Sequence, residues 1–103
     1  MFAGHSIVKV YRNQTVTTGV GIVDLSYFSG SYFIVLVPKT YTPTSSVSFI
    51  FVLNNSTGVQ RDVFNFSSIG SQGPLNGILL TGDVLRFQNI NITFDLFVFT
   101  ANG

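Results

Sequence analysis

Residues 47–66 read VSFIFVLNNSTGVQRDVFNF, and this stretch decides the fold class. It contains two runs rich in Val, Ile and Phe, residues 47–53 and 59–66, separated by the polar segment Asn54-Asn55-Ser56-Thr57-Gly58. β-branched and aromatic residues favour strands, and a short loop with Asn and Gly between two such runs is typical of a hairpin. The stretch therefore predicts two antiparallel strands joined by a five-residue turn.

The same pattern continues in both directions along the chain. Further short apolar runs, separated by clusters of Gly, Pro, Asn and Ser, predict strands at residues 6–12, 15–25, 32–37, 77–80, 84–89 and 92–101. Gly19 and Gly21 lie within the second of these, where a bulge would fit, and Pro38 is expected to end the third and open a loop to residue 46. No apolar residues recur at helical spacing over three turns.

Eight short strands in 103 residues predict one all-β domain over residues 1–103. We expect a single antiparallel eight-stranded sandwich. The two-sheet jelly roll is the first choice of topology, and an immunoglobulin-like sandwich is the second.

Charged residues make up only 9% of the chain, against about 25% in an average soluble domain. The net charge of +1 comes from scattered residues, which build no basic patch, so we expect no nucleic-acid partner. A free monomer usually stays soluble through interspersed surface charge. The composition therefore favours a protein packed against neighbours, with a secreted monomer that has a hydroxyl-rich surface as the alternative.

The chain has no cysteine, so it has no disulfide framework. Its longest apolar runs, residues 33–37 and 49–53, are too short for a transmembrane segment. The first residues, MFAGH, have no basic start and no continuous apolar stretch, unlike a secretory signal. We therefore expect a protein that acts where it is made, as a virion protein does, with an extracellular or cell-surface location as the alternative.

Several predicted strands are apolar on both faces, although only one face of a strand can point into the core. In residues 47–53, Ile50 and Val52 alternate with phenylalanines, and in residues 92–101, Phe97 and Phe99 alternate with Leu and Val. We expect Ile50, Val52, Phe97 and Phe99, or the residues opposite them if the register is reversed, to form an interface that a partner covers.

Residues that could carry chemistry are few. His5 is the only histidine, and the acids are four Asp with no Glu, so we expect no catalytic residues, no cofactor and no metal site. Asp62 beside Arg61 indicates a solvated ion pair, and Asp83 after Gly82 indicates a turn. Asp24 and Asp95 fall within apolar strands, where a buried carboxylate would need a partner such as Arg12 or Arg86.

Two features leave glycan contact open. Glycosylation acceptor patterns begin at Asn13, Asn54, Asn55, Asn65 and Asn91. Sugar rings could stack on an exposed tyrosine, for which the candidates are Tyr11, Tyr27, Tyr32 and Tyr41.

The segments GILLTGDVLRF at residues 77–87 and TFDLFVF at residues 93–99 resemble the closing strands of the trimeric jelly-roll heads of the complement and tumour-necrosis-factor superfamily. The short, Cys-free composition, with few charges and abundant Phe, Val, Thr and Asn, resembles that of small structural proteins of viruses, including viruses of hyperthermophilic archaea. Either resemblance implies jelly-roll subunits that meet around a symmetry axis, with no catalytic residues.

The sequence thus favours a non-enzymatic structural subunit that self-associates or docks on a larger assembly. A virion minor capsid, decoration or spike-base protein is the first hypothesis. A carbohydrate- or receptor-binding module, such as an adhesin or a trimeric fibre head, is the first alternative. The second is an extracellular filament subunit in which residues 92–101 add to the sheet edge of a neighbour.

Overall fold

The structure is a computed structural model that describes residues 6–66 and 74–100. These residues form eight strands: β1 (Ile7–Val16), β2 (Val20–Asp24), β3 (Tyr32–Pro43), β4 (Phe49–Asn54), β5 (Gln60–Asn65), β6 (Leu75–Leu79), β7 (Asp83–Gln88) and β8 (Ile90–Thr100). The all-β prediction is confirmed. None of the described residues belongs to a helix long and apolar enough to cross a membrane.

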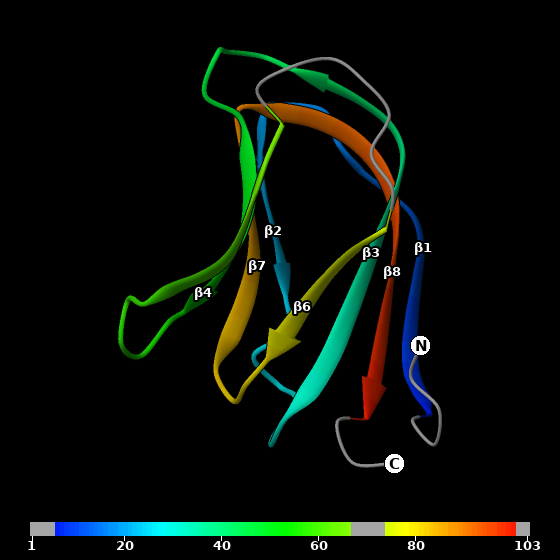
Figure 1. Cartoon of the computed structure of the whole chain (residues 1–103), viewed down its shortest axis with the longest axis vertical. Coiled ribbons are helices and arrows are strands. Elements are labelled where there is room, and N and C mark those ends of the chain that lie inside the picture. Colours follow the sequence, from blue (N-terminus) through cyan, green and yellow to red (C-terminus); the bar gives the residue numbers. More distant parts are fainter. Residues whose placement is uncertain (1–5, 67–73, 101–103) are drawn as a thin grey trace.

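The strands pair into two four-stranded antiparallel sheets that face each other as a sandwich (Figure 1). Sheet A has the order β1-β8-β3-β6, and sheet B has the order β2-β7-β4-β5. Neighbours within each sheet are mostly distant in sequence, so the chain crosses repeatedly between the two layers. This arrangement confirms the eight-stranded sandwich and is compatible with the expected jelly roll.

The core lies between the inner faces of the two sheets. On sheet A, inward and outward side chains alternate along β8 and β3. The inward residues Leu96, Val98 and Ile34 are at most 2% exposed. Sheet B contributes Leu85 and Phe87 among others. The ring of Phe87 stacks on that of Phe94 of sheet A, with 5.0 Å between centroids, and this contact joins the layers through the apolar interior.

Strand β3 is longer than expected, because Pro38 does not end it. Pro38 pairs with Phe94 of β8, and the register then shifts between Pro38 and Thr40 before pairing continues to Pro43. A proline within a strand is tolerated at such an irregularity, where its missing N–H costs no ladder hydrogen bond. Most of the loop predicted up to residue 46 is therefore strand.

The expected strand at residues 15–25 is instead divided between the two sheets. Its first two residues end β1, and the chain turns at Gly19, whose φ of +79° lies in the left-handed region that favours glycine. The Gly19 carbonyl accepts a hydrogen bond of 3.0 Å from the N–H of Ile90, which fixes the turn to β8. The bulge predicted at this point is thus a crossover between the layers.

The predicted hairpin between residues 47 and 66 is present as β4 and β5. The side-chain oxygen of Asn54 accepts hydrogen bonds of 3.0 Å from the N–H groups of Ser56 and Thr57. Gly58 then adopts a φ of +73° and donates to the Asn54 carbonyl at 2.8 Å. The Asn and Gly of the loop therefore build the turn, as the sequence pattern indicates.

Candidate interaction surface

A row of four apolar side chains runs straight across the outer face of sheet A. Phe99 of β8 pairs with Ile7 of β1 on one side and with Phe33 of β3 on the other, and Phe33 pairs in turn with Ile78 of β6. Directly opposed residues of antiparallel strands point to the same face. Ile7 and Ile78 are 52% and 46% exposed, while Phe33 and Phe99 between them are half-buried.

A second row lies two residues along β8 and β3, and three residues along β1 because of the register shift between Ile7 and Lys9. Phe97 of β8 pairs with Val10 of β1 and with Val35 of β3. Together we call these two rows the apolar face, which consists of Ile7, Val10, Phe33, Val35, Ile78, Phe97 and Phe99. No strand within residues 6–66 and 74–100 packs over it, since sheet B lies on the opposite side of sheet A.

An ion cluster borders the apolar face. The carboxylate of Asp95 lies 3.6 Å from Arg12 and 3.5 Å from Lys39, and its Oδ1 accepts a 2.9 Å hydrogen bond from the N–H of Asn13. Asn13 adopts a φ of +52° at an irregularity of β1, which turns this N–H towards the carboxylate. The guanidinium of Arg12 also lies over the ring of Phe97, 5.7 Å from its centroid. Arg12 thus joins the charged cluster to the apolar rows.

The pKa of Asp95 is lowered from its ordinary value. The main cause is the backbone hydrogen bond from Asn13, which desolvation opposes, and the charges of Lys39 and Arg12 add to the lowering. The Asp95 side chain is only 9% exposed, whereas those of Arg12 and Lys39 are 67% and 42% exposed. The cluster therefore presents two cations to solvent around a shielded carboxylate.

The structure separates the four predicted interface residues into two pairs. Phe97 and Phe99 lie on the apolar face, half-buried. Ile50 and Val52 do not lie on any surface of the subunit: both are 0% exposed and pack in the core, opposite Phe87 and Leu85 of β7. Their placement at an interface is wrong, because alternation along β4 shows which residues share a face but not which face turns inward.

The predicted patch also fails as a single surface, because β4 and β8 belong to different sheets. On β4, the residues that turn outward are Phe49, Phe51 and Leu53. Phe51 is nevertheless only 4% exposed, and its ring lies 5.6 Å from that of Phe49. Neighbouring side chains within the subunit therefore cover much of the outer face of β4.

Exposed apolar residues on sheet B lie instead at its edges. Val20 and Ile22 of β2 are each 60% exposed, and Val63 of β5 is 56% exposed. Arg86 and Gln88 of β7 lie between β2 and β4 on this sheet. The outer face of sheet B is thus more mixed than that of sheet A.

The other aspartates have structural partners. Asp24 is exposed, and its Oδ1 accepts hydrogen bonds from the N–H and hydroxyl of Ser26, which lower its pKa. Asp83 is fully buried and accepts a 2.7 Å hydrogen bond from the N–H of Leu80 across the turn, as its position after Gly82 indicates. Arg61 is not part of a simple solvated pair: it lies 3.8 Å from Asp62 but also binds Asp83.

The tyrosines offer little for sugar stacking. Tyr41 packs edge-on against Phe66, and Tyr32 packs edge-on against Phe28. Tyr11 packs against the core and shares a hydrogen bond with Tyr27, and its burial, more than this bond, raises the pKa of Tyr11. Tyr27 is 62% exposed, but one side of its ring stacks on Phe28 at 4.6 Å.

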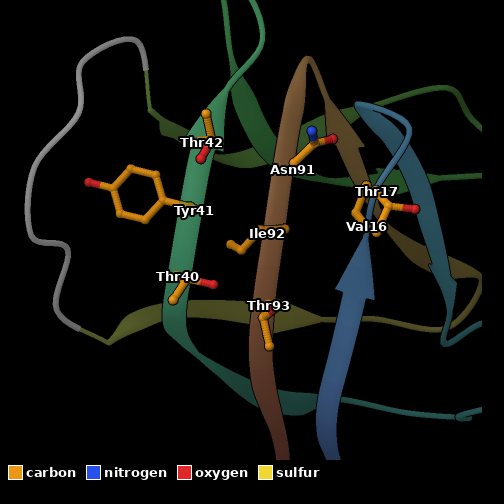
Figure 2. A pocket seen from close by; sticks show the side chains of 8 residues that line it. All are labelled: Val16, Thr17, Thr40, Tyr41, Thr42, Asn91, Ile92 and Thr93. Carbon is orange, nitrogen blue, oxygen red and sulfur yellow. The ribbon is translucent and has the colours of Figure 1, made fainter.

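A shallow hydroxyl-rich pocket of about 170 Å³ lies where β1, β8 and β3 run side by side (Figure 2). It is lined by Val16, Thr17, Thr40, Tyr41, Thr42, Asn91, Ile92 and Thr93. The structure records no hydrogen bond from the four threonine hydroxyls to residues 6–66 or 74–100. Asn91 is different, because its Oδ1 accepts a 2.8 Å hydrogen bond from the N–H of Gly19.

Within the described part of the chain, no three side chains of the types that bind metals lie together. His5 lies outside the described residues. Comparisons with protein families, with curated proteins and with solved structures found no match to this chain. The apolar face of sheet A is therefore the basis for a functional proposal.

Proposed function

We propose that this protein is a non-enzymatic structural subunit that self-associates or docks on a larger assembly, as a virion minor capsid, decoration or spike-base protein. The observation that carries the proposal is the apolar face of sheet A. Its row from Ile7 to Ile78 crosses all four strands, so it is continuous rather than a set of isolated side chains.

Covering this face is energetically favourable. Removing one large apolar side chain from water contributes roughly 1.5–3 kcal/mol when burial is complete. Ile7 and Ile78 have about half of their surface still to bury, and the half-buried Phe97 and Phe99 have a smaller share. Several such contributions together can offset the cost of fixing two molecules in one orientation.

The ion cluster would give the contact a direction. The exposed cations Arg12 and Lys39 border one side of the apolar face, whereas the carboxylate of Asp62 lies beside Ile78 and accepts a 2.9 Å hydrogen bond from its N–H. An apolar centre with a charged rim is the usual anatomy of a protein interface. The rim favours partners that place acceptors or acids beside Arg12 and disfavours partners that place cations there.

The aspartates support a structural role over catalysis. Asp24 binds Ser26, Asp83 binds Leu80 and Arg61, and Asp95 lies between Arg12 and Lys39. Each carboxylate thereby stabilises a turn or an irregular strand. Together with a charged fraction of 9%, this arrangement suits a subunit held among neighbours.

Light scattering coupled to size-exclusion chromatography tests the proposal. We expect the wild-type protein to form an assembly, and the double variant I7S/I78S to shift towards the monomer with at least tenfold weaker association. Val63→Ser is the matched control, because Val63 is 56% exposed but lies on sheet B. A wild-type protein that stays monomeric at high concentration and binds no particle would contradict the proposal.

The hydroxyl-rich pocket favours a second candidate function, a carbohydrate-binding module. Neutral hydroxyls and an amide are groups that hydrogen-bond to sugars, and the pocket in Figure 2 contains no charged side chain. The variant T40V/T93V removes two hydroxyls and keeps the side-chain shape. If a glycan array shows binding by the wild-type protein, loss of that binding in this variant would support the second candidate, and unchanged binding would place the glycan elsewhere.

A further inference from the structure

The sandwich has four edge strands, and three of them carry features that block pairing with another strand. Edge strands expose unpaired backbone groups, so proteins commonly protect them. On β6, the N–H of Ile78 donates to Asp62 at 2.9 Å, and its carbonyl accepts a 3.2 Å hydrogen bond from Arg61. Both partners come from β5, so this side of the sandwich is closed by side chains.

The edges of β5 and β1 are irregular. Asp62 of β5 has a φ of +51°, and the register with β4 shifts beside it. Strand β1 has two register shifts and carries Lys9 and Arg12. Bulges twist an edge away from a straight partner, and charged side chains oppose the approach of a second chain.

Strand β2 has fewer of these features, although at its start the hydroxyl of Thr18 donates a 3.0 Å hydrogen bond to the carbonyl of Val20. Its five residues, Val20 to Asp24, pair with β7 without a register shift, and no other described strand pairs with it. Val20 and Ile22 point outward and are each 60% exposed, and the one charge, Asp24, lies at the end of the strand. A straight, apolar and uncharged edge is the type that accepts another strand.

We propose that two copies of this chain associate by pairing their β2 edges antiparallel across a two-fold axis, so that the two B sheets become one eight-stranded sheet. The inference rests on the self-association proposed above and adds a second contact, through sheet B, to the apolar face of sheet A. A two-fold contact of identical strands closes on itself, so the β2 contact alone produces a dimer and not a filament.

The side chains of β2 specify a register. In the joined sheet, the outward side chains of both copies lie on one face only if even-numbered residues of β2 oppose even-numbered residues of the other copy. With the axis beside Gly21, Val20 of each copy lies opposite Ile22 of the other, and Asp24 lies opposite the polar Thr18. With the axis beside Ile22, Asp24 would instead oppose the apolar Val20. The first register pairs β-branched residues with each other and is favoured for that reason.

The absence of cysteine from the sequence permits a direct test by cross-linking, since an engineered cysteine is then the only thiol of its chain. Opposed side chains on paired strands have Cβ atoms about 4.5–5.5 Å apart, close to the spacing of a disulfide. We expect a mixture of V20C and I22C chains to form a mixed disulfide dimer under mild oxidation, at least tenfold faster than either variant alone. V63C, which has similar exposure on β5, is the control and should not cross-link.

Cross-linking can contradict the inference in two ways, in the register or in the contact itself. Rapid cross-linking of I22C alone would place the axis beside Ile22, and equal rates for V63C and the mixture would show random collision.

A charge on the edge gives a second measurement that needs no oxidation: Ile22→Lys should weaken dimerisation at least tenfold, and Val63→Lys should not. If I7S/I78S dissociates the assembly but Ile22→Lys leaves it unchanged, the proposed function stands and the β2 contact is wrong. A wild-type monomer would overturn this inference even if the protein docks on a particle.

Discussion

The guanidinium of Arg61 on β5 binds the carboxylate of Asp83, which is fully buried at the start of β7. The same carboxylate accepts hydrogen bonds from the side chain of Asn54 at 2.9 Å and from the N–H of Leu80 at 2.7 Å. Arg61 also donates to the carbonyl of Ile78, in the other sheet. One arginine thus links the two layers and compensates a buried charge.

Replacing this arginine tests how much the link stabilises the fold. Arg61→Ala leaves Asp83 buried without its cation, and we expect the free energy of unfolding to fall by about 3 kcal/mol, because removing one partner of a buried pair leaves an uncompensated charge. Chemical denaturation measures the change. Lys39→Ala, which removes a more exposed cation beside Asp95, serves as the control and should cost less than about 1 kcal/mol. Equal losses in the two variants would contradict the structural role of Arg61.

The contact of Gly21 with Val16 gives a second prediction. A Cβ on residue 21 would lie 2.9 Å from Cγ2 of Val16, closer than carbon atoms approach without displacement. We expect Gly21→Ala to destabilise the fold by about 1–3 kcal/mol through overpacking. In the double variant G21A/V16A the clash is absent, so its loss should be smaller than the sum of the two single losses. Strict additivity in thermal or chemical unfolding would show that the two residues do not touch.

Asp95 predicts a dependence of stability on pH. Because its pKa is lowered in the folded state, its ionised form contributes stability above the ordinary pKa of 3.8, and this contribution is lost as the pH falls through the folded value. Asp95→Asn should therefore be less stable than the wild-type protein at pH 7, and the difference should shrink as the pH falls below 3.8. Denaturation of both proteins across this range measures it. A difference that is constant with pH would exclude the ion cluster as its cause.

The fold class was predictable because its signals are local. Strand-forming runs and the loop residues Asn54 to Gly58 determine the hairpin whatever the rest of the chain does. The prediction that Pro38 ends its strand was wrong for a physical reason, because a proline ends a regular strand but is accommodated beside a register shift. The partner strand that provides this shift is more than fifty residues away in the sequence. Pairing across such distances leaves no signal in the local sequence.

The candidate surface was predictable only in part. Phe97 and Phe99 alternate with Leu96 and Val98, and the structure turns the aromatic pair outward. In β4 both faces are apolar, so periodicity could not distinguish Ile50 and Val52, which are in the core, from Phe51. The sequence predicted an ion pair between Arg61 and the adjacent Asp62, and this prediction did not include the contact of Arg61 with Asp83. The strand order places β5 and β7 on either side of β4, and Arg61 reaches Asp83 across that strand.

The different places of Ile50 and Phe97 lead to opposite expectations for stability and assembly. Ile50→Ala removes buried atoms and leaves a cavity, so we expect a loss of about 2–5 kcal/mol in the free energy of unfolding. Phe97→Ser changes a half-buried residue on the apolar face, so its main expected effect is on association, with a smaller loss of stability. Unfolding experiments at low protein concentration and light scattering at high concentration separate the two effects. If Phe97→Ser destabilises the isolated subunit as much as Ile50→Ala and leaves its association unchanged, then the ring of Phe97 acts within the subunit and the apolar face is not a contact surface.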